Sequence, residues 1–128
     1  MTEKELCREA IILSGVSPEK CMKCGKCTGS CPSYNEMEYH PHEFVGMVAK
    51  GKIYALMNSE SIYKCLSCFV CVERCPRNVC PANIIEAVRQ LKERNIGEDR
   101  LKTDNLQNIL DEDTPSQLFM AAMRKYSK

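Results

Sequence analysis

Two runs of cysteine constrain this chain more than any other feature of its sequence. Each run has four cysteines separated by two, two and three residues, and a proline directly follows the last one. The first run is Cys21, Cys24, Cys27, Cys31 and Pro32, and the second is Cys65, Cys68, Cys71, Cys75 and Pro76. This is the spacing of the thiolate ligands of a [4Fe–4S] cluster. The sequence therefore predicts a fold organised around two iron–sulfur clusters.

The chemistry of a cubane cluster explains the spacing. Its four iron corners each need one thiolate, and three cysteines at three-residue intervals can curl a short loop around one side. In two-cluster ferredoxins the fourth corner is supplied by the fourth cysteine of the other run, so the two runs cross over. We therefore expect one cluster held by Cys21, Cys24, Cys27 and Cys75, and a second held by Cys65, Cys68, Cys71 and Cys31.

Three other uses of the ten cysteines fit the sequence less well. Structural zinc sites usually take two CxxC pairs that lie far apart, and a third closely spaced cysteine serves no tetrahedral site. A disulfide framework is typical of secreted chains, and no apolar signal segment begins this sequence. A [3Fe–4S] cluster would need a missing ligand, and none is missing. Cys7 and Cys80 lie outside both runs, and we expect each to be a small packed thiol.

Length and composition limit the class of protein. A chain of 128 residues is expected to form one domain with a small core, so the clusters must contribute to its folding free energy. The formal charge is +1, with 18 basic and 17 acidic residues in short alternation. Two bound clusters would lower this charge by about four units. No basic stripe indicates nucleic-acid binding, and no apolar run approaches the length of a membrane span. Cysteine usage without a signal segment favours a cytoplasmic protein of a reducing, oxygen-poor cell.

Helical patterns flank both runs, and no segment alternates as a strand would. We expect helices over residues 2–14, where Thr2 and Glu5 can form a capping box, over 41–51, and from just after Cys80 and Pro81 to Gly97. The apolar residues between the runs, such as Phe44 and Val48, are expected to pack over the clusters. His40 and His42 are expected to be surface or capping histidines, because the eight cysteines leave no vacant ligand position.

The two cluster loops differ in their other residues. Lys23 and Lys26 lie in the first loop, where positive charge would raise the cluster potential if it were not simply solvated. The second loop carries Phe69 and Val70 instead, so its cluster is expected to be the drier one.

The last thirty residues change character. Residues 98–114 are polar, and Pro115 opens an amphipathic segment with Leu118, Phe119, Ala122 and Met123. We therefore divide the chain into a cluster-binding domain, residues 1–97, and a tail, residues 98–128. The tail is interpreted as a docking arm for another subunit or as a helix folded back on its own domain.

Three stretches carry a resemblance to a known family. They are CMKCGKCTGSCP at 21–32, KCLSCFVCVERCPRNV at 64–79 and IIEAVRQLK at 84–92. The chain resembles the small iron–sulfur subunit of heterodisulfide reductase, its C subunit, over roughly residues 15–97. Succinate dehydrogenase and glycolate or lactate oxidase iron–sulfur subunits share the domain type. The sequence has neither the [2Fe–2S] cysteine set of the first nor the paired-cysteine repeats of the glycolate oxidase subunits.

The resemblance implies a mainly α fold, an α-helical ferredoxin domain around two [4Fe–4S] clusters with a C-terminal helical tail. It also implies a role. The C subunit relays single electrons between a flavin-containing A subunit and a catalytic B subunit, which reduces the disulfide of coenzymes M and B. The chain itself shows no dinucleotide loop, no nucleophile with a base and no open metal site, so we expect no catalytic site of its own.

Other functions remain as alternatives. A free-standing soluble ferredoxin-like carrier would be expected to have a strongly acidic surface, and the charge here is nearly balanced. The chain could instead serve another oxidoreductase complex as its iron–sulfur subunit. A redox sensor would be expected to pair its cluster with a DNA-binding element, which the sequence lacks. An enzyme using Cys7 or Cys80 as nucleophile would need a base that the sequence does not place nearby.

Overall fold

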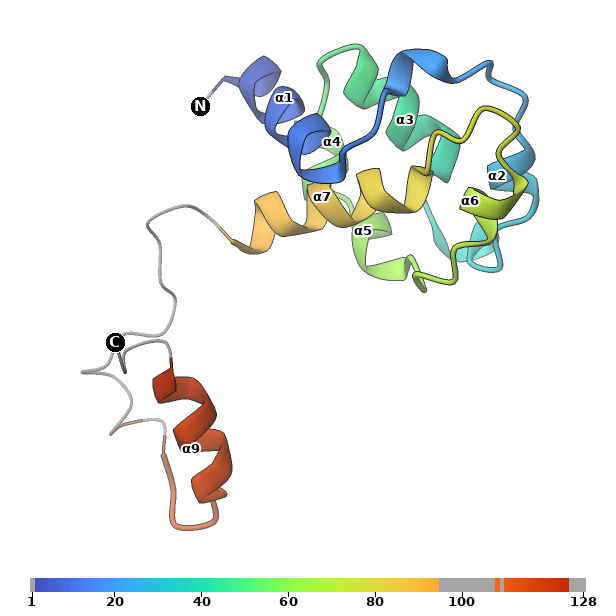
Figure 1. The fold of residues 1–128 in the computed structure, drawn as a ribbon. Coiled ribbons are helices and arrows are strands. Elements are labelled where there is room, and N and C mark those ends of the chain that lie inside the picture. The colour runs from blue at the N-terminus through green and yellow to red at the C-terminus, as the bar shows by residue number, and fades with distance from the viewer. Residues whose placement is uncertain (1, 95–107, 109, 125–128) are drawn as a thin grey trace. The chain divides into compact units, whose positions relative to one another are not determined.

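The computed structural model describes residues 2–94, 108 and 110–124, and it divides into two compact units, residues 1–94 and 95–128 (Figure 1). The described residues form helices and no strands, which confirms the mainly α prediction. The elements are α1 (Glu3–Ser14), η1 (Pro18–Lys20), α2 (Lys26–Gly29), η2 (Tyr34–Glu36), α3 (Pro41–Ala49), α4 (Tyr54–Asn58), α5 (Ser61–Lys64), α6 (Val70–Arg74), α7 (Pro81–Glu93) and α9 (Ser116–Met123). The predicted domain boundary between 97 and 98 lies outside the described residues.

The first helix begins and ends as its sequence predicts. The Thr2 backbone N–H donates to the Glu5 carboxylate at 2.7 Å, and the Glu5 N–H donates to the Thr2 hydroxyl at 3.4 Å. These two bonds satisfy N–H groups that a helix start would otherwise leave unpaired. Gly15, with a φ of 65°, ends the helix in the left-handed conformation that glycine adopts without strain.

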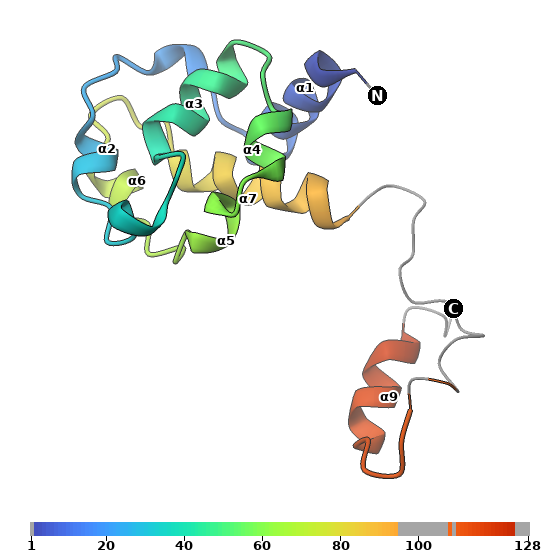
Figure 2. The same cartoon turned by 180° about the vertical axis from the view of Figure 1, so that it is seen from behind.

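Helix α7 is the element on which the first unit is built. Helices α1, α3, α4, α5 and α6 all pack against it, and Figures 1 and 2 show it running through the middle of this unit. Its apolar stripe, Ile84, Ile85 and Val88, is fully buried. The sequence predicts that this helix ends at Gly97, but the observed helix ends four residues earlier, at Glu93. Gly97 itself is not among the described residues.

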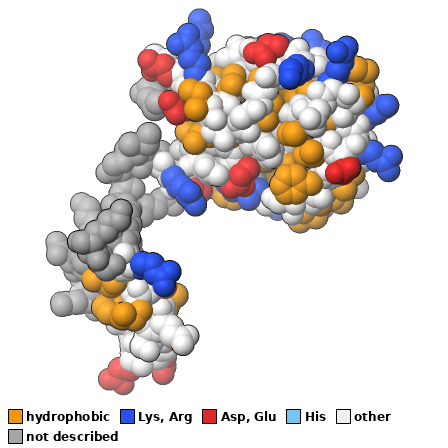
Figure 3. All heavy atoms as spheres, viewed as in Figure 1, with side chains coloured by type: hydrophobic (Ala, Val, Ile, Leu, Met, Phe, Trp, Pro, Cys, Tyr) orange, Lys and Arg blue, Asp and Glu red, His pale blue; other side chains and the backbone are white. Residues whose placement is uncertain are grey.

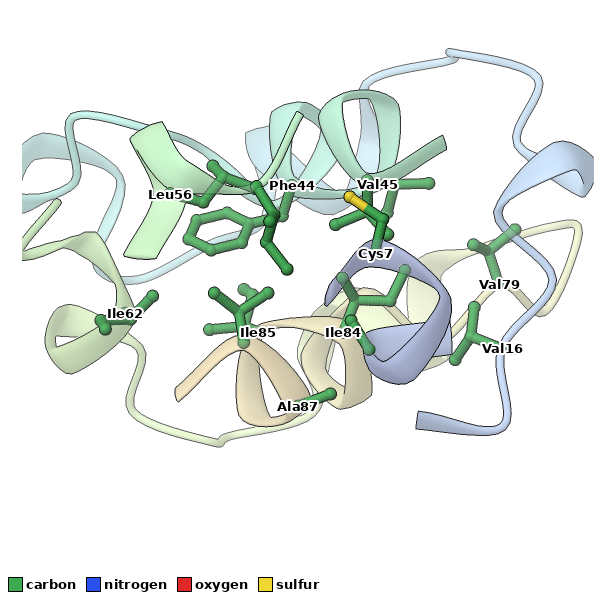
Figure 4. Packing of buried hydrophobic residues seen from close by; sticks show 14 of the residues in the cluster. Cys7, Val16, Phe44, Val45, Leu56, Ile62, Val79, Ile84, Ile85 and Ala87 are labelled. Carbon is green, nitrogen blue, oxygen red and sulfur yellow. The ribbon is translucent and has the colours of Figure 1, made fainter. Parts of the chain in front are cut away.

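The hydrophobic core lies between α7 and the helices around it. Figure 4 shows Phe44 of α3 and Ile85 of α7 on facing elements, with Leu56 and Ile62 beside them. Phe44, Leu56 and Ile62 are completely buried. The sequence predicts that the apolar residues between the runs cover the clusters, but most of them form this core. The reason is that α3 and α7 bury the long apolar faces of both helices against each other.

A polar contact joins α7 to the start of the second cysteine run. The Arg89 guanidinium donates from Nε to the Ile62 carbonyl at 2.8 Å and from Nη2 to the Cys65 carbonyl at 3.5 Å. These carbonyls lie at the end of α5, where no helical donor remains for them. Arg89 therefore fixes the position of the second run relative to α7.

The second unit contains α9, which has the helical form predicted from Pro115 onward. Leu118 and Met120 on this helix are 62% and 67% exposed. In the part of the chain that the structure describes, no helix combines the length and hydrophobicity that crossing a membrane requires.

Candidate metal centre

The two cysteine runs meet at one end of the first unit. Each run forms a loop followed by a short helix, α2 in the first and α6 in the second, and these two helices lie side by side (Figures 1 and 2). The third cysteine of each run lies on its short helix, and the fourth follows directly or one residue later. Each short helix therefore connects two thiols that are four residues apart in the sequence.

The two loops have nearly the same backbone conformation. The residue before the second cysteine has a positive φ in both, 57° at Lys23 and 53° at Ser67. The residue after it does as well, 75° at Gly25 and 61° at Phe69. Such left-handed residues turn successive backbone N–H groups toward one concave side, which suits an anionic group. The Lys23 N–H already contacts the Cys21 Sγ at 3.4 Å.

Two cavities open between the loops, each with about 350 to 370 Å³ of empty space including its mouth. The thiols that line the first, cavity 1, are Cys21, Cys24, Cys27 and Cys75. The thiols that line the second, cavity 2, are Cys31, Cys65, Cys68 and Cys71. The eight cysteines are thus divided four and four, with the last cysteine of each run in the other run's cavity. The same two groups of cysteines were expected from the sequence; that they bind clusters stays a prediction.

The donor set fits an iron–sulfur cluster. Four thiols and no carboxylate line each cavity, and thiolates are the ligands of such clusters. Among the residues described, no group of three or more Cys, His, Asp or Glu side chains is arranged to hold a single metal ion.

Two long helices direct their N-termini at the cavities. Pro41 and His42, the first residues of α3, line cavity 2 and cavity 1. Pro81 and Ala82, the first residues of α7, line cavity 1 and cavity 2. The partial positive charge of a helix N-terminus favours an anion. Thiolate ligands bring negative charge, so the N-termini of both helices would stabilise an anionic group bound in the cavities.

Burial separates the thiols into inner and outer ones. Burial raises the pKa of Cys71 to about 11, although the backbone N–H of Ala82 opposes this shift. Burial also raises the pKa of Cys27 and Cys31. Cys27 and Cys71 lie on the adjacent helices α2 and α6. Cys24 and Cys68, by contrast, are exposed at the surface.

The rims of the two cavities differ. Lys23 and Arg77 line cavity 1, whereas Leu66 and Phe69 line cavity 2 and are 69% and 49% exposed. Figure 3 shows basic and apolar side chains gathered on this end of the first unit. The expectation that the second cluster is the drier one stays a prediction.

The two histidines have different surroundings. His40 caps α3, because its backbone N–H donates to the Glu43 carboxylate at 2.8 Å and its Nδ1 lies 3.1 Å from the same oxygen. This confirms a capping role. His42 is exposed, as predicted, but it also lines cavity 1, and its Nδ1 lies 2.5 Å from the buried Thr28 hydroxyl. Sequence reasoning missed this contact, and the only signal for it was a threonine beside Cys27.

Cys7 and Cys80 lie apart from both groups of thiols. Cys7 is 4% exposed and belongs to the core, where Figure 4 shows it on α1. Cys80 is half-buried against the same core, with its Sγ 3.8 Å from the Asn78 carbonyl oxygen. Neither lines cavity 1 or cavity 2. Their predicted packing role is consistent with these positions.

Comparison with known proteins gives one family model and several relatives. Residues 17–79 match the model of the 4Fe-4S dicluster domain. The chain is 40% identical over 75 residues to the C2 subunit of the H(2)/formate:CoB-CoM heterodisulfide,ferredoxin reductase of Methanococcus maripaludis, covering 59% of this chain and 40% of that protein. It is 37% identical over 73 residues to the C subunit of the ferredoxin:CoB-CoM heterodisulfide reductase of Methanosarcina acetivorans, covering 57% of this chain and 29% of that protein.

A third relative is matched over a longer stretch. The C subunit of the H(2):CoB-CoM heterodisulfide,ferredoxin reductase of Methanothermobacter thermautotrophicus is 31% identical over 87 residues, covering 68% of this chain and 47% of that protein. The chain thus spans less than half the length of each of these three curated relatives.

Proposed function

We propose that the chain is the electron-relay subunit of a heterodisulfide-reductase-type complex, a proposal supported by the match of residues 17–79 to the 4Fe-4S dicluster domain. Its partners would be a flavin-containing subunit and a disulfide-reducing subunit, as the family resemblance implies. The names of the relatives, which are C subunits of heterodisulfide reductases, support a place among other subunits. The observation that carries the proposal is the division of eight thiols between two adjacent cavities.

We assign two clusters to the cavities. Cluster I would be held by Cys21, Cys24, Cys27 and Cys75, and cluster II by Cys65, Cys68, Cys71 and Cys31. The lining of the two cavities supports these sets, as does the crossed pattern of two-cluster ferredoxins. Bound there, the clusters would supply one-electron redox chemistry, and the protein contributes position, shielding and charge.

The burial of the thiols suggests a route for the electron. Cys24 and Cys68 are exposed, one at each cavity, so each cavity reaches the surface at a point where a partner can dock. The inner thiols Cys27 and Cys71 are more shielded and lie on the adjacent helices α2 and α6. A relay needs this arrangement, with two outer contacts and a dry passage between them.

Paired substitutions test the ligand sets. In the crossed arrangement, Cys24→Ser and Cys75→Ser should alter the same EPR component of the anaerobically purified, reduced protein. Cys68→Ser and Cys31→Ser should both alter the other component. An uncrossed arrangement would instead pair Cys24 with Cys31 and Cys68 with Cys75. Cys80→Ser is the matched control and should leave both components unchanged.

Iron and sulfide analysis tests the cofactor itself. About eight irons and eight acid-labile sulfides per chain are expected of two [4Fe–4S] clusters. Zinc, or about four irons, would contradict the assignment. Proteins that copurify would identify the complex, and a flavoprotein with a second iron–sulfur protein is the expected result.

A further inference from the structure

The inner walls of the two cavities correspond residue by residue at the start of α3 and α7, although their rims differ. Each is lined by the proline that begins a long helix, Pro81 in cavity 1 and Pro41 in cavity 2, and by an apolar residue of α3 or α7, Val45 or Ile85. His42 of α3 lines cavity 1 at the position where Ala82 of α7 lines cavity 2. Both follow the first proline of their helix directly.

The residue after the third cysteine differs in the same way. Thr28 follows Cys27, and Val72 follows Cys71. Cavity 1 is therefore flanked by a hydroxyl and an imidazole, where the corresponding residues of cavity 2 are Val72 and Ala82. The thiols of the two cavities are otherwise arranged alike, so this pair is a candidate source of any difference between them.

The Thr28 hydroxyl has three polar neighbours. The His42 backbone N–H donates to Oγ1 at 3.3 Å, the His42 Nδ1 lies 2.5 Å from Oγ1, and the Cys27 Sγ lies 3.9 Å from it. The Thr28 side chain is buried, with 8% of its surface exposed, so water does not compete freely for these positions. The His42 ring connects this buried group to the surface.

The capacity of a hydroxyl decides the direction of these bonds. It has one hydrogen to donate and two lone pairs that accept. The His42 backbone N–H occupies one lone pair. A cysteine sulfur that binds iron carries no hydrogen and can only accept, so the hydroxyl hydrogen satisfies it and the second lone pair accepts from Nδ1–H. With iron bound to Cys27, this assignment pairs all three neighbours and requires the His42 tautomer with hydrogen on Nδ1.

We propose that Thr28 and His42 are positioning residues that direct a hydrogen bond onto the Cys27 sulfur, giving the cluster of cavity 1 the higher reduction potential. This inference rests on the proposed iron–sulfur function. Hydrogen bonds to the sulfurs of a cluster tune its potential, and a donor stabilises the more negative, reduced state. Backbone N–H groups act on the third cysteine of both cavities, among them that of Ala82 on Cys71. The Thr28 hydroxyl is the additional donor of cavity 1, because Val72 offers no hydroxyl to Cys71.

Exposed charges act in the same direction and must be separated from this effect. Lys23 and Arg77 line cavity 1 and would also favour a reduced cluster. The titratable neighbours of His42 are Glu43 and His40. Salt screens the two exposed cations, because the Debye length is only about 3 Å at 1 M ionic strength. The hydrogen bond from the buried Thr28 hydroxyl to the Cys27 sulfur is screened much less.

The test is an EPR-monitored redox titration of both clusters at high salt, on cluster-loaded protein with measured iron and sulfide. Thr28→Val has nearly the same shape but no hydroxyl, and the potential of one cluster should fall while the other stays. Thr28→Ser keeps the hydroxyl and should restore the wild-type value. His42→Phe removes the ring nitrogen beside the hydroxyl but keeps the backbone N–H that donates to it, and should lower the same potential by less. Ser30→Ala removes a hydroxyl of the same turn that donates to the Lys26 carbonyl, and should change neither potential.

A second readout keeps the inference falsifiable if Thr28→Val loads poorly. After exchange into D₂O, the reduced wild type should show an exchangeable deuteron near one cluster by ENDOR, and His42→Phe should weaken this signal. Unchanged potentials in Thr28→Val, equal shifts of both clusters, or a Thr28→Ser protein that behaves as Thr28→Val would overturn the inference. A low iron content in the wild type would contradict the proposed function instead, so the two failures are distinguishable.

Discussion

The left-handed turn at Gly25 gives a sharp test of how the first loop is held. Gly25 has a φ of 75°, and no atom lies within 4 Å of the position that a Cβ would take. An alanine at this position meets no other protein atom, and the cost considered is the backbone strain of a side chain in the left-handed region, about 1–2 kcal/mol. Reduced freedom of the unfolded chain offsets about 0.4–1 kcal/mol. The net destabilisation of the loop is about 1 kcal/mol.

Cluster loss in denaturant, followed by visible absorbance under anaerobic conditions, measures this effect. A cost of about 1 kcal/mol accelerates the loss about fivefold if the strain is released in the transition state. Gly29→Ala is the matched control, because Gly29 ends α2, has no positive φ and has equally open space around it. Alanine is favoured in a helix, so this variant should slow the loss or leave it unchanged. Equal acceleration by both variants would refute the strain at Gly25 as the cause.

Four further outcomes follow from the structure. Cys7→Ser should retain full iron but lose about 1–3 kcal/mol of stability in thermal unfolding, because it buries a hydroxyl in the core. Arg89→Lys should unfold more easily in denaturant by about 1–2 kcal/mol, because lysine cannot donate to the Ile62 and Cys65 carbonyls with the same fork. Removing residues 98–128 should leave the iron content intact and abolish copurification of partners, because Leu118 and Met120 are exposed for docking; a complex that survives truncation refutes the docking role. Removal of iron should make the amides of residues 21–31 and 65–75 exchange rapidly with D₂O, while those of α3 and α7 stay protected. Uniform loss of protection would show that the hydrophobic core does not stay folded without iron.

The helices of the first unit were predictable where local signals agree. Thr2, Glu5 and Gly15 delimit α1, and the Pro81 start and the spacing of Ile84, Ile85 and Val88 identify α7. Both follow from capping chemistry and a period of 3.6 residues, which need no knowledge of the rest of the fold. The end of α7 was not predictable from Gly97, because the observed helix stops earlier, at Glu93.

The second loop shows how a local rule can mislead. Gly25 is an expected left-handed residue, but Phe69 has a φ of 61° at the matching position of the second loop. Sequence reasoning would not assign that conformation to a phenylalanine. The surrounding loop imposes it, because the same cysteine spacing needs the same turn of backbone N–H groups.

The sequence by itself determined which metal ligands this chain offers. Two runs of the same spacing specify eight soft donors in two groups, since ligand spacing is a local property of the chain. Only the tertiary structure decided what surrounds each group. Thr28 and His42 are fourteen residues apart, and they meet because α3 directs its N-terminus at the first loop. Contacts of this kind depend on how helices pack, so the sequence specifies two similar loops but not the hydrogen bond that makes one cavity different from the other.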